Sequence, residues 1–599
     1  MTFLVLPDRA LPPTPADGVG PKEIRHHSGR PWLVGDWHDD DITVAEHGPN
    51  RLVLLGPALT TPGELTRRLG AVRSTADLDP LLRAIAGSFH ALASIDGRVR
   101  AQGTLSTARQ VCHAVVHGAT LVSDRPDLLA DLIGAQVDEE QLALELLAPF
   151  GPPWPLGERT AWRGVRVPRT GECLEVDRDG SCRTRRWWTP PDPVLPLGDG
   201  GAVRDALLDA VAARTRQGGT VSADLSGGLD STTLCFLAAR GPADLVTVHY
   251  EALGRFSDDR EQAARAATAL GQAHHVVVPA GRAPDWFAPL ERVRHDRQGP
   301  LVFARGRATN EHLAGAVAAL GSRRHLQGIG GDELFHAGTM ALHALARQRP
   351  AAAVRHARAM RAHRRWSLAA TAGVLAFHRS YPRWLADQAD RLGRPPTAFG
   401  APAWEVEPLL PPWAGRDAAA TVRRALRDAA ASDLEPLSPI PAQHEMIRIT
   451  AVNGRAVRRN SGIASASGVT FEAPFTDDRV LEAVLSLRFA DRIDQHRFKP
   501  VLGTAVRGLV PADVLRRETK NDASAELYAG LRARRDELLA LFADSRLAAR
   551  GLIDPAPLRH VLRGAHADAR PLMPFDPTLA CELWLRALDP AALPAEEAR

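Results

Sequence analysis

Short apolar segments separated by turn residues characterise the first part of the chain. The segments 51–55 and 113–116 have the length and the leucine and valine content of strands. Residues 139–147 place their apolar side chains at helical spacing instead. This pattern predicts a sheet-rich α+β domain over residues 1–195, which ends in the tryptophan- and proline-rich linker 186–193.

From residue 196 onward, predicted helices and strands alternate along the chain. Strands are predicted at 220–225, 245–250 and 274–278, and helices at 203–214, 232–240, 257–270 and 305–320. Alternation at this spacing is typical of βαβ units, so residues 196–599 are expected to contain a doubly wound parallel sheet. Further helices are predicted over 339–430 and 440–590. The fold class is therefore a two-domain α/β protein.

The turn after the strand at 220–225 combines small residues with one acid. It is formed by Leu225, Ser226, Gly227, Gly228, Asp230 and Ser231. Adjacent glycines let backbone N–H groups approach an anion closely, and the start of the following helix carries partial positive charge. Ligands of such sheets bind at the carboxyl ends of the strands. We therefore expect this turn to bind the phosphates of a nucleotide, and a plain helix-capping turn is the alternative.

A second glycine turn ends in an acid about a hundred residues later. Gly328, Gly330 and Gly331 precede Asp332 there, between another predicted strand and helix. On neighbouring strands, Asp230 and Asp332 could hold one Mg²⁺ that also binds phosphate oxygens, because magnesium prefers one or two carboxylates together with phosphate.

The composition narrows the functional classes. The net charge is only +4, so we expect no nucleic-acid partner. The five cysteines are scattered along the chain, which predicts neither a disulfide framework nor a zinc site. Because the N-terminus lacks the features of a signal peptide and no long apolar run occurs, we expect a cytoplasmic protein without a membrane span. Only three of the 74 basic residues are lysines: Lys22, Lys499 and Lys520. A lysine kept in this arginine-rich background is a candidate functional residue.

Six motifs follow one another in the order of the asparagine synthetase superfamily, which the chain resembles. They lie at 226–231, 258–261, 330–335, 471–477, 498–502 and 515–520. The resemblance implies an ATP-pyrophosphatase synthetase domain that uses ATP and Mg²⁺ and cleaves ATP between its α- and β-phosphates. It also implies that Lys499 is the catalytic lysine.

Two departures from the superfamily pattern restrict the chemistry. Glutamine-using members have a cysteine after the initiator methionine, whereas this chain has Thr2. Residues 1–195 are therefore expected to form a glutaminase-like (Ntn-type) α+β sandwich that is inactive. Ile329 stands where asparagine synthetases have a glutamate and β-lactam synthetases a tyrosine, and isoleucine cannot exchange a proton. Glu445 is the candidate replacement base, and the alternative is a surface glutamate paired with Arg448.

The segments 121–126, 132–138, 162–165, 186–188 and 582–586 resemble the lasso peptide cyclases, which fuse an inactive glutaminase-like domain to this synthetase domain. That resemblance implies adenylation of an Asp or Glu side chain of a precursor core peptide, followed by closure of a macrolactam by the N-terminal amine. It also implies a leader peptidase and a leader-binding protein as pathway partners. The alternatives are a small-molecule amide synthetase of asparagine synthetase or β-lactam synthetase type, and a binding protein on a decayed synthetase fold.

Overall fold

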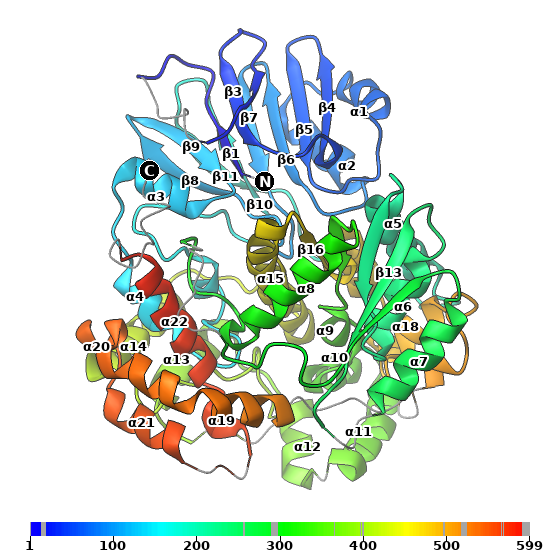
Figure 1. Cartoon of the computed structure of the whole chain (residues 1–599), viewed down its shortest axis with the longest axis vertical. Helices are drawn as coiled ribbons and strands as arrows, with labels where there is room; N and C mark the ends of the chain where they lie inside the picture. The colour runs from blue at the N-terminus through cyan, green and yellow to red at the C-terminus, as the bar shows by residue number, and fades with distance from the viewer. Residues whose placement is uncertain are drawn as a thin grey trace.

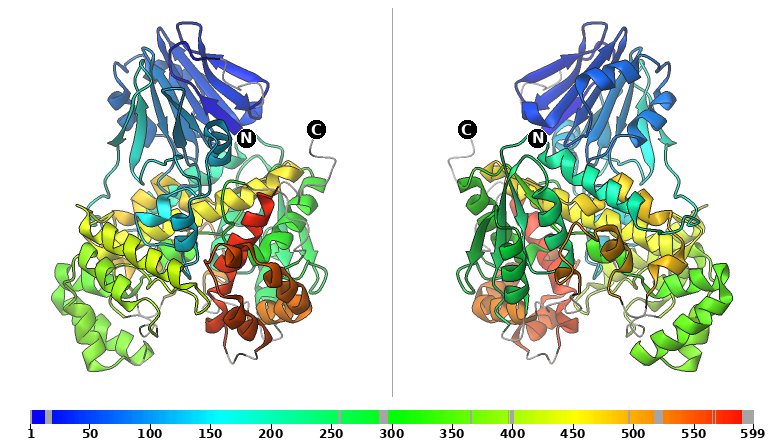
Figure 2. Two further views of the ribbon diagram at one scale, coloured as in Figure 1. Left: turned by 90° about the vertical axis from the view of Figure 1, so that its left-hand side faces the viewer. Right: turned by 90° about the vertical axis from the view of Figure 1, so that its right-hand side faces the viewer.

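Two units stacked on one another make up the chain (Figures 1 and 2). The computed structural model describes residues 2–12, 19–254, 258–288, 297–364, 366–395, 397, 401–494, 497–516, 524–564, 566 and 568–589. The N-terminal unit, blue to cyan in Figure 1, lies above a larger unit that contains a parallel sheet and most of the helices. None of the helices in the described ranges has the length and apolarity needed to cross a membrane.

The N-terminal unit is a sandwich of two antiparallel sheets. One sheet has the order β2 (Lys22–Arg25), β3 (Pro31–Asp36), β1 (Thr2–Val5), β9 (Ala119–Ser123) and β8 (Cys112–Val116). The other has the order β11 (Cys182–Arg186), β10 (Glu172–Val176), β7 (Arg98–Gln102), β6 (His90–Ile95), β5 (Asn50–Leu55) and β4 (Ile42–His47). Side chains such as Phe3, Trp32 and Leu92 fill the space between the two sheets, as expected of two apolar inner faces.

Helices cover the outer faces of this sandwich. The six-stranded sheet packs against α1 (Pro62–Leu69) and α2 (Leu78–Arg83), and the five-stranded sheet against α3 (Pro126–Ile133). Thr61 caps α1 by accepting a hydrogen bond from the Glu64 N–H, and a proline in the first turn favours the helix start. The fourth helix, α4 (Glu139–Glu145), lies beside helices of the second unit.

The second unit is built on a five-stranded parallel sheet. Its order is β14 (His274–Val278), β13 (Asp244–Tyr250), β12 (Thr220–Asp224), β15 (Arg324–Leu326) and β16 (Thr470–Glu472). Every neighbouring pair is parallel, with Val221 opposite Leu245 on one side and Arg324 on the other. The carboxyl ends of β12 and β15 therefore lie next to each other at the same edge of the sheet.

Both faces of the parallel sheet are covered. On one face lie α5 (Gly201–Thr215), α6 (Leu229–Ala238), α7 (Asp259–Ala269), α16 (Asp478–Leu485) and α18 (Pro500–Ala505). On the other lie α8 (Arg307–Ala319) and the end of the long helix α15 (Pro441–Ala464). The short helix α9 (Gly331–Phe335) lies near the carboxyl edge of the sheet. Another short helix, α17 (Phe489–Arg492), lies beside α10 (Thr339–Gln348).

Two groups of further helices extend the lower part of the molecule in Figure 1. The first group is α10 (Thr339–Gln348), α11 (Pro350–Arg364), α12 (Leu368–Leu375), α13 (Tyr381–Arg391) and α14 (Arg416–Ala431). The second is α19 (Ser524–Leu541), α20 (Arg546–Ala549), α21 (Pro555–Arg563) and α22 (Phe575–Ala587). The largest hydrophobic cluster joins side chains of α3 and α4 with side chains of both groups.

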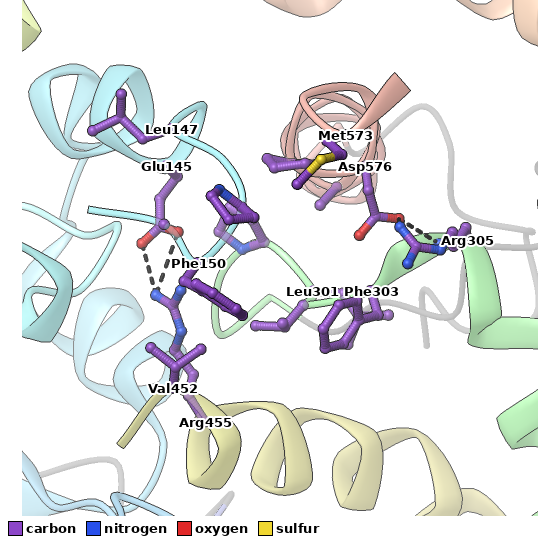
Figure 3. A pocket seen from close by; sticks show the side chains of 16 residues that line it. Glu145, Leu147, Phe150, Leu301, Phe303, Arg305, Val452, Arg455, Met573 and Asp576 are labelled. Carbon is purple, nitrogen blue, oxygen red and sulfur yellow. Dashed lines mark hydrogen bonds and ion pairs between the residues drawn. The ribbon is translucent and has the colours of Figure 1, made fainter. Parts of the chain in front are cut away.

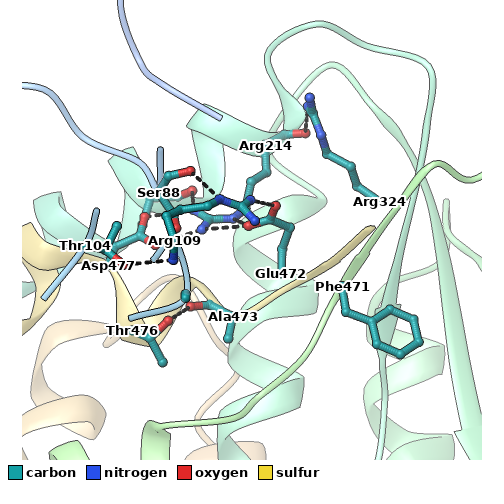
Figure 4. A network of polar contacts seen from close by, with 12 residues as sticks. Ser88, Thr104, Arg109, Arg214, Arg324, Phe471, Glu472, Ala473, Thr476 and Asp477 are labelled. Atoms are coloured by element: carbon teal, nitrogen blue, oxygen red, sulfur yellow. Dashed lines mark hydrogen bonds and ion pairs between the residues drawn. The ribbon is translucent and has the colours of Figure 1, made fainter. Parts of the chain in front are cut away.

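A buried charge network fixes the N-terminal unit to the end of β16 (Figure 4). Arg109 bonds to Glu472, and its Nε also donates to the Ser88 carbonyl oxygen at 3.2 Å. Arg214 of α5 bonds to the same Glu472 and to both carboxylate oxygens of Asp477, at 2.7 and 2.8 Å. Each charge is paired, which offsets the cost of burying it. We call these four charged residues the interdomain charge network.

The predicted fold class is confirmed. The predicted strands 51–55 and 113–116 are β5 and β8, and the three strands of the synthetase unit are β12, β13 and β14. The helix predicted at 257–270 is α7, with residue 257 outside the described residues. The linker 186–193 is not a free tether, because Trp187 and Trp188 are buried and the Trp188 indole donates to Glu482 at 2.6 Å. The domain boundary at residue 195 stays a prediction.

Candidate functional site

The first glycine turn is held in shape by its own serines. The hydroxyls of Ser226 and Ser231 lie 2.8 Å apart, and the Gly228 N–H donates to the Ser226 hydroxyl at 3.3 Å. Gly227 has a φ of +83°, a conformation that favours glycine. Both backbone polar groups of Leu225 are engaged, with Val248 and His249. The turn joins β12 to the first residue of α6 and so lies at the carboxyl edge of the sheet.

The second glycine turn packs directly against the first. A Cβ on Gly331 would lie 2.4 Å from Cγ of Asp230, and a Cβ on Gly328 would lie 2.9 Å from the Ser231 backbone nitrogen. Gly330 has a φ of +92° and would bring a Cβ within 2.9 Å of Thr476. Only glycine fits these positions, because neighbouring β12 and β15 bring the two turns together.

Lys499 joins the two aspartates. Its ammonium group lies 2.8 Å from a carboxylate oxygen of Asp332 and also forms an ion pair with Asp230. The lysine side chain is 1% exposed, whereas those of Asp230 and Asp332 are 15% and 37% exposed. Lys499 has a φ of +48°. This left-handed conformation is energetically costly for a residue other than glycine, and residues that adopt it are often found at functional sites. The structure thus brings Asp230, Asp332 and Lys499 into one group, which we call the acidic–lysine cluster.

The acidic–lysine cluster offers two carboxylates as possible ligands of a Mg²⁺ ion. Two carboxylates are close enough to contact one ammonium group, and the Asp230 carboxylate packs against Gly331. In the described part of the chain, no group of three or more His, Cys, Asp or Glu side chains is placed to hold a metal ion. Two carboxylates match a magnesium ion that takes its remaining oxygens from water and phosphate. The residues therefore fit a metal that arrives with a nucleotide.

Glu445 lies in the first turns of α15, half-buried and facing the start of α10. The nearest contact of a Cβ on Gly338 would be a Glu445 carboxylate oxygen, at 3.7 Å, and Gly338 is six residues from Asp332. Burial raises the pKa of Glu445 to about 7, and the negative charge of Glu405 contributes to the increase. A carboxyl group with this pKa can take up and release protons near neutral pH.

The surface-pair alternative for Glu445 does not match the structure, because Arg448 has other partners. Arg448 forms an ion pair with Glu405 and donates to the backbone carbonyl oxygens of Phe150 and Pro152. Glu405 is fully enclosed and also accepts hydrogen bonds from Tyr381 at 2.5 Å and from the backbone N–H of Trp154 at 3.2 Å. Arg448 therefore belongs to a separate buried network behind Glu445.

His444 completes the network behind Glu445. Its Nδ1 accepts a hydrogen bond from the Leu437 N–H at 3.0 Å, so its Nε2 donates to Glu405, also at 3.0 Å. Burial lowers the pKa of His444, which favours this neutral form. We infer that the network fixes the first turns of α15, and with them the position of Glu445.

Thr2 and Ile329, the two residues at which the chain departs from the superfamily pattern, occupy ordinary structural positions. Thr2 is the first residue of β1, and it pairs with Asp36 in the antiparallel sheet. Ile329 lies between Gly328 and Gly330 in the second glycine turn and is half-buried. Residues 517–520 of the last predicted motif lie outside the described residues.

Two buried histidines below the first glycine turn were missed in the sequence. His249 donates from Nδ1 to the Leu225 carbonyl oxygen at 2.9 Å, and its buried Nε2 has no hydrogen-bond partner among the described residues. His325 of β15 bonds to Asp224, the last residue of β12, at 2.9 Å. Both histidines lie within strands, near the carboxyl edge of the sheet. A polar residue inside an otherwise apolar strand was the sequence signal that could have identified them.

Comparisons with known proteins found partial similarities. Carboxyethyl-arginine beta-lactam-synthase from Streptomyces clavuligerus is 39% identical over 89 residues, which are 14% of this chain and 17% of that protein. Glutamine phosphoribosylpyrophosphate amidotransferase from B. subtilis, solved with ADP and GMP, matches 51% of this chain and 63% of its own, at 9% identity and a TM-score of 0.19. The allosteric regulatory enzyme of purine biosynthesis matches 41% and 63%, at 11% identity and a TM-score of 0.17.

The chain thus spans less than two thirds of the length of each of these relatives. The family model of asparagine synthase matches residues 202–586, which is more than half of the chain and includes both glycine turns, Lys499 and Glu445. The chain belongs to the asparagine synthase family.

Proposed function

We propose that this protein is an ATP-dependent lasso peptide cyclase. It adenylates an Asp or Glu side chain of a precursor core peptide, and the N-terminal amine of that peptide then attacks, with release of AMP and pyrophosphate. A leader peptidase and a leader-binding protein of the same pathway supply the peptide. The observation that carries the proposal is the convergence of Asp230, Asp332 and Lys499 beside two glycine turns. This arrangement suits phosphate oxygens, and it favours an enzyme over a binding protein on a decayed synthetase fold.

Each residue of the site has a role in this reaction. The N–H groups of Gly227 and Gly228 and the start of α6 bind phosphate oxygens. Asp230 and Asp332 would hold Mg²⁺, and the ion would supply positive charge against that of the pyrophosphate. Lys499 exchanges its aspartate partners for the negative charge that develops on the α-phosphate and on the acyl oxygen. A compact ammonium group suits such a point contact.

The second step requires removal of a proton from the attacking amine. Ile329 cannot perform this step, whereas Glu445 has a pKa of about 7 and faces Gly338, close to the helix that carries Asp332. We assign the base to Glu445. The amine then attacks the acyl carbon, AMP leaves with the bonding electron pair, and an amide bond closes the ring.

A small-molecule amide synthetase is the second candidate, favoured by the local similarity to the beta-lactam-synthase. Two points count against this candidate. Position 329 is an isoleucine, which cannot transfer a proton as the corresponding residue of such synthetases does, and we assign the base to Glu445 instead. The lasso-cyclase-like segments of the N-terminal unit and of α22 count in favour of a peptide substrate.

The experiment compares the two candidates directly. The protein is incubated with Mg-ATP and either a leader-free candidate core peptide that contains an Asp or Glu acceptor or a panel of small amino dicarboxylates, aspartate and N2-(carboxyethyl)arginine among them. We expect pyrophosphate release that depends on the peptide. Release with a small substrate alone would favour the second candidate, and release of ADP and orthophosphate would contradict both.

A further inference from the structure

A cavity of about 150 Å³ lies between the N-terminal unit, α15 and α22 (Figure 3). Its walls come from four separate segments: residues 147–151, residues 300–305, the middle of α15, and the start of α22. Apolar side chains line its centre, among them Phe150, Leu301, Phe303 and Val452. Neither glycine turn nor Lys499 lines this cavity, so it is separate from the site described above.

The charges around the cavity cancel in pairs. On one side, Arg455 lies 3.0 Å from Glu145, and on the other, Arg305 lies 3.7 Å from Asp576 (Figure 3). The Arg305 backbone N–H also donates to Asp576 at 3.1 Å. Because each charge faces an opposite charge within the wall, the cavity favours a neutral apolar group over an ion.

The volume fits one large side chain. An apolar cavity of about 150 Å³ in another protein holds a benzene molecule, which has the size of a phenylalanine ring. Phe303 and Met573, at the rim of the cavity, are 43% and 38% exposed. Exposed apolar side chains around a cavity are typical of a site that receives an apolar partner.

The cavity and Glu445 lie on the same face of α15. Val452 follows Glu445 by seven residues, almost two full turns, so the two side chains project in nearly the same direction. Most positions between residues 441 and 453 are buried, and residues 445, 451 and 452 are the half-buried ones. Residues 446–450 between them are buried, so Glu445 and the cavity are two separate accessible places on one face of the helix.

The cavity also lies at the functional edge of the sheet. Residues 300–305 lead into α8, which connects β14 to β15. In such a crossover the helix begins on the side of the carboxyl ends of the strands. Both glycine turns follow β12 and β15 at the same edge, so the cavity and the glycine turns lie on the same side of the sheet.

We propose that this cavity binds an aromatic or large aliphatic side chain of the peptide substrate and so selects the residue near the one that is activated. The assignment to a peptide rests on the proposed function. Seven residues of α-helix span about 10 Å, and an extended peptide advances about 3.4 Å per residue. The selected side chain is therefore roughly three residues from the activated Asp or Glu.

Variants that fill the cavity test the proposal. Met573→Trp blocks it from the rim and Val452→Phe from the opposite wall, while Met573→Leu keeps the volume. Leu368→Trp is the matched control, because Leu368 is an exposed apolar residue of α12 outside the cavity, at 70% exposure. The thermal midpoint and the Mg-ATP affinity of every variant are compared with those of the wild type. If one filling variant differs from the wild type in either property, the other filling variant is used.

The first readout does not depend on enzyme activity. Binding of N-acetyl-L-phenylalanine methylamide is measured by NMR on the full-length protein, with the glycine analogue as the control ligand. We expect the wild type, Met573→Leu and Leu368→Trp to bind the phenylalanine probe, and the filling variants to bind it at least fivefold more weakly. Absence of binding to the wild type, or equal binding to the filling variants, would overturn the proposal.

The second readout uses peptide-dependent pyrophosphate release. The filling variants should raise the KM for the leader-free peptide about tenfold with an unchanged KM for ATP. In the peptide, replacing an apolar residue by alanine should raise KM only at the position roughly three residues from the acceptor. If the wild type releases no pyrophosphate but the probe binds as expected, the proposed function fails and the binding cavity stands. An unchanged peptide KM in both filling variants would overturn its role in substrate selection.

Discussion

The ammonium group of Lys499 lies 2.8 Å from a carboxylate oxygen of Asp332, although Lys499 directly precedes α18 and Asp332 lies in α9. The same ammonium group contacts Asp230, at the start of a third helix. A lysine between two carboxylates stabilises the site before a nucleotide binds, since each aspartate would otherwise face the negative charge of the other. In the proposed reaction, Lys499 would leave the aspartates and contact the reacting groups.

Substitutions of Lys499 should show that its shape matters as well as its charge. Lys499→Arg should reduce adenylation nearly as far as Lys499→Ala, roughly a hundredfold or more, because a planar guanidinium cannot take the place of a compact ammonium in a 1%-exposed site. Peptide-dependent pyrophosphate release measures the effect. Lys22→Arg is the matched control, since Lys22 forms a surface pair with Asp39 and should leave the rate unchanged. A Lys499→Arg variant with more than half of wild-type activity would refute the assigned role.

Substitution of Glu445 should separate the two chemical steps. Glu445→Gln should still release pyrophosphate but should form mainly AMP and uncyclised peptide, because the acyl-adenylate is hydrolysed when the amine keeps its proton. Mass spectrometry of the peptide products distinguishes the outcomes. Cyclisation at the wild-type rate in Glu445→Gln would place the base elsewhere.

The raised pKa of Glu445 predicts the pH dependence of both activity and stability. The base is active when it is deprotonated, so the cyclisation rate should rise with pH through about 7. For stability, the folded pKa lies above that of the unfolded chain, so the contribution of this group is fully present at pH 4 and is lost as the pH rises through 7. The unfolding free energy of Glu445→Gln relative to wild type should therefore increase between pH 5 and pH 8. A pH-independent difference would contradict the raised pKa.

The interdomain charge network should contribute strongly to stability. Glu472→Gln removes the carboxylate charge shared by Arg109 and Arg214, and breaking such a buried pair costs about 3–5 kcal/mol. The thermal unfolding transition should shift to lower temperature. Arg83→Ala, which removes an exposed partner of Glu482, should change the unfolding free energy by about 1 kcal/mol or less. Equal effects of the two substitutions would show that the network has no special importance.

The N-terminal unit should not hydrolyse glutamine. Thr2 begins a paired strand and stands where glutamine-using relatives have a cysteine. Ammonia or glutamate formation from glutamine should stay at the background of a heat-treated sample, with or without ATP. Glutamine-dependent glutamate formation above that background would contradict the prediction.

Much of this arrangement could be predicted from local sequence patterns. The two glycine turns follow short apolar strands, so their position at one sheet edge follows from βαβ alternation. The contact of Lys499 with Asp230 joins residues 269 apart and depends on the left-handed conformation of Lys499. Neither feature has a local signal. The same holds for Arg109 and Glu472, which are 363 residues apart.

The helical additions show a second limit of sequence patterns. Their alanine- and arginine-rich composition predicts helices over 339–430, but it does not indicate which buried surface each helix will contact. Arg448 illustrates this limit, because its spacing from Glu445 predicts a local ion pair and its actual partner is Glu405, 43 residues earlier in the chain. Long-range packing, which a helical pattern leaves open, decided the environment of the proposed base.

The most direct test of the account is the stoichiometry of a single reaction mixture. The full-length protein is incubated with Mg-ATP and the leader-free peptide, and AMP, pyrophosphate and the peptide products are measured together. The account predicts one AMP and one pyrophosphate for each peptide that becomes lighter by one water and loses its free N-terminal amine, and none of these products for an Asp230→Asn variant. Peptide that stays unmodified while ATP is converted to AMP, or a product that keeps its free amine, would contradict the proposed cyclisation.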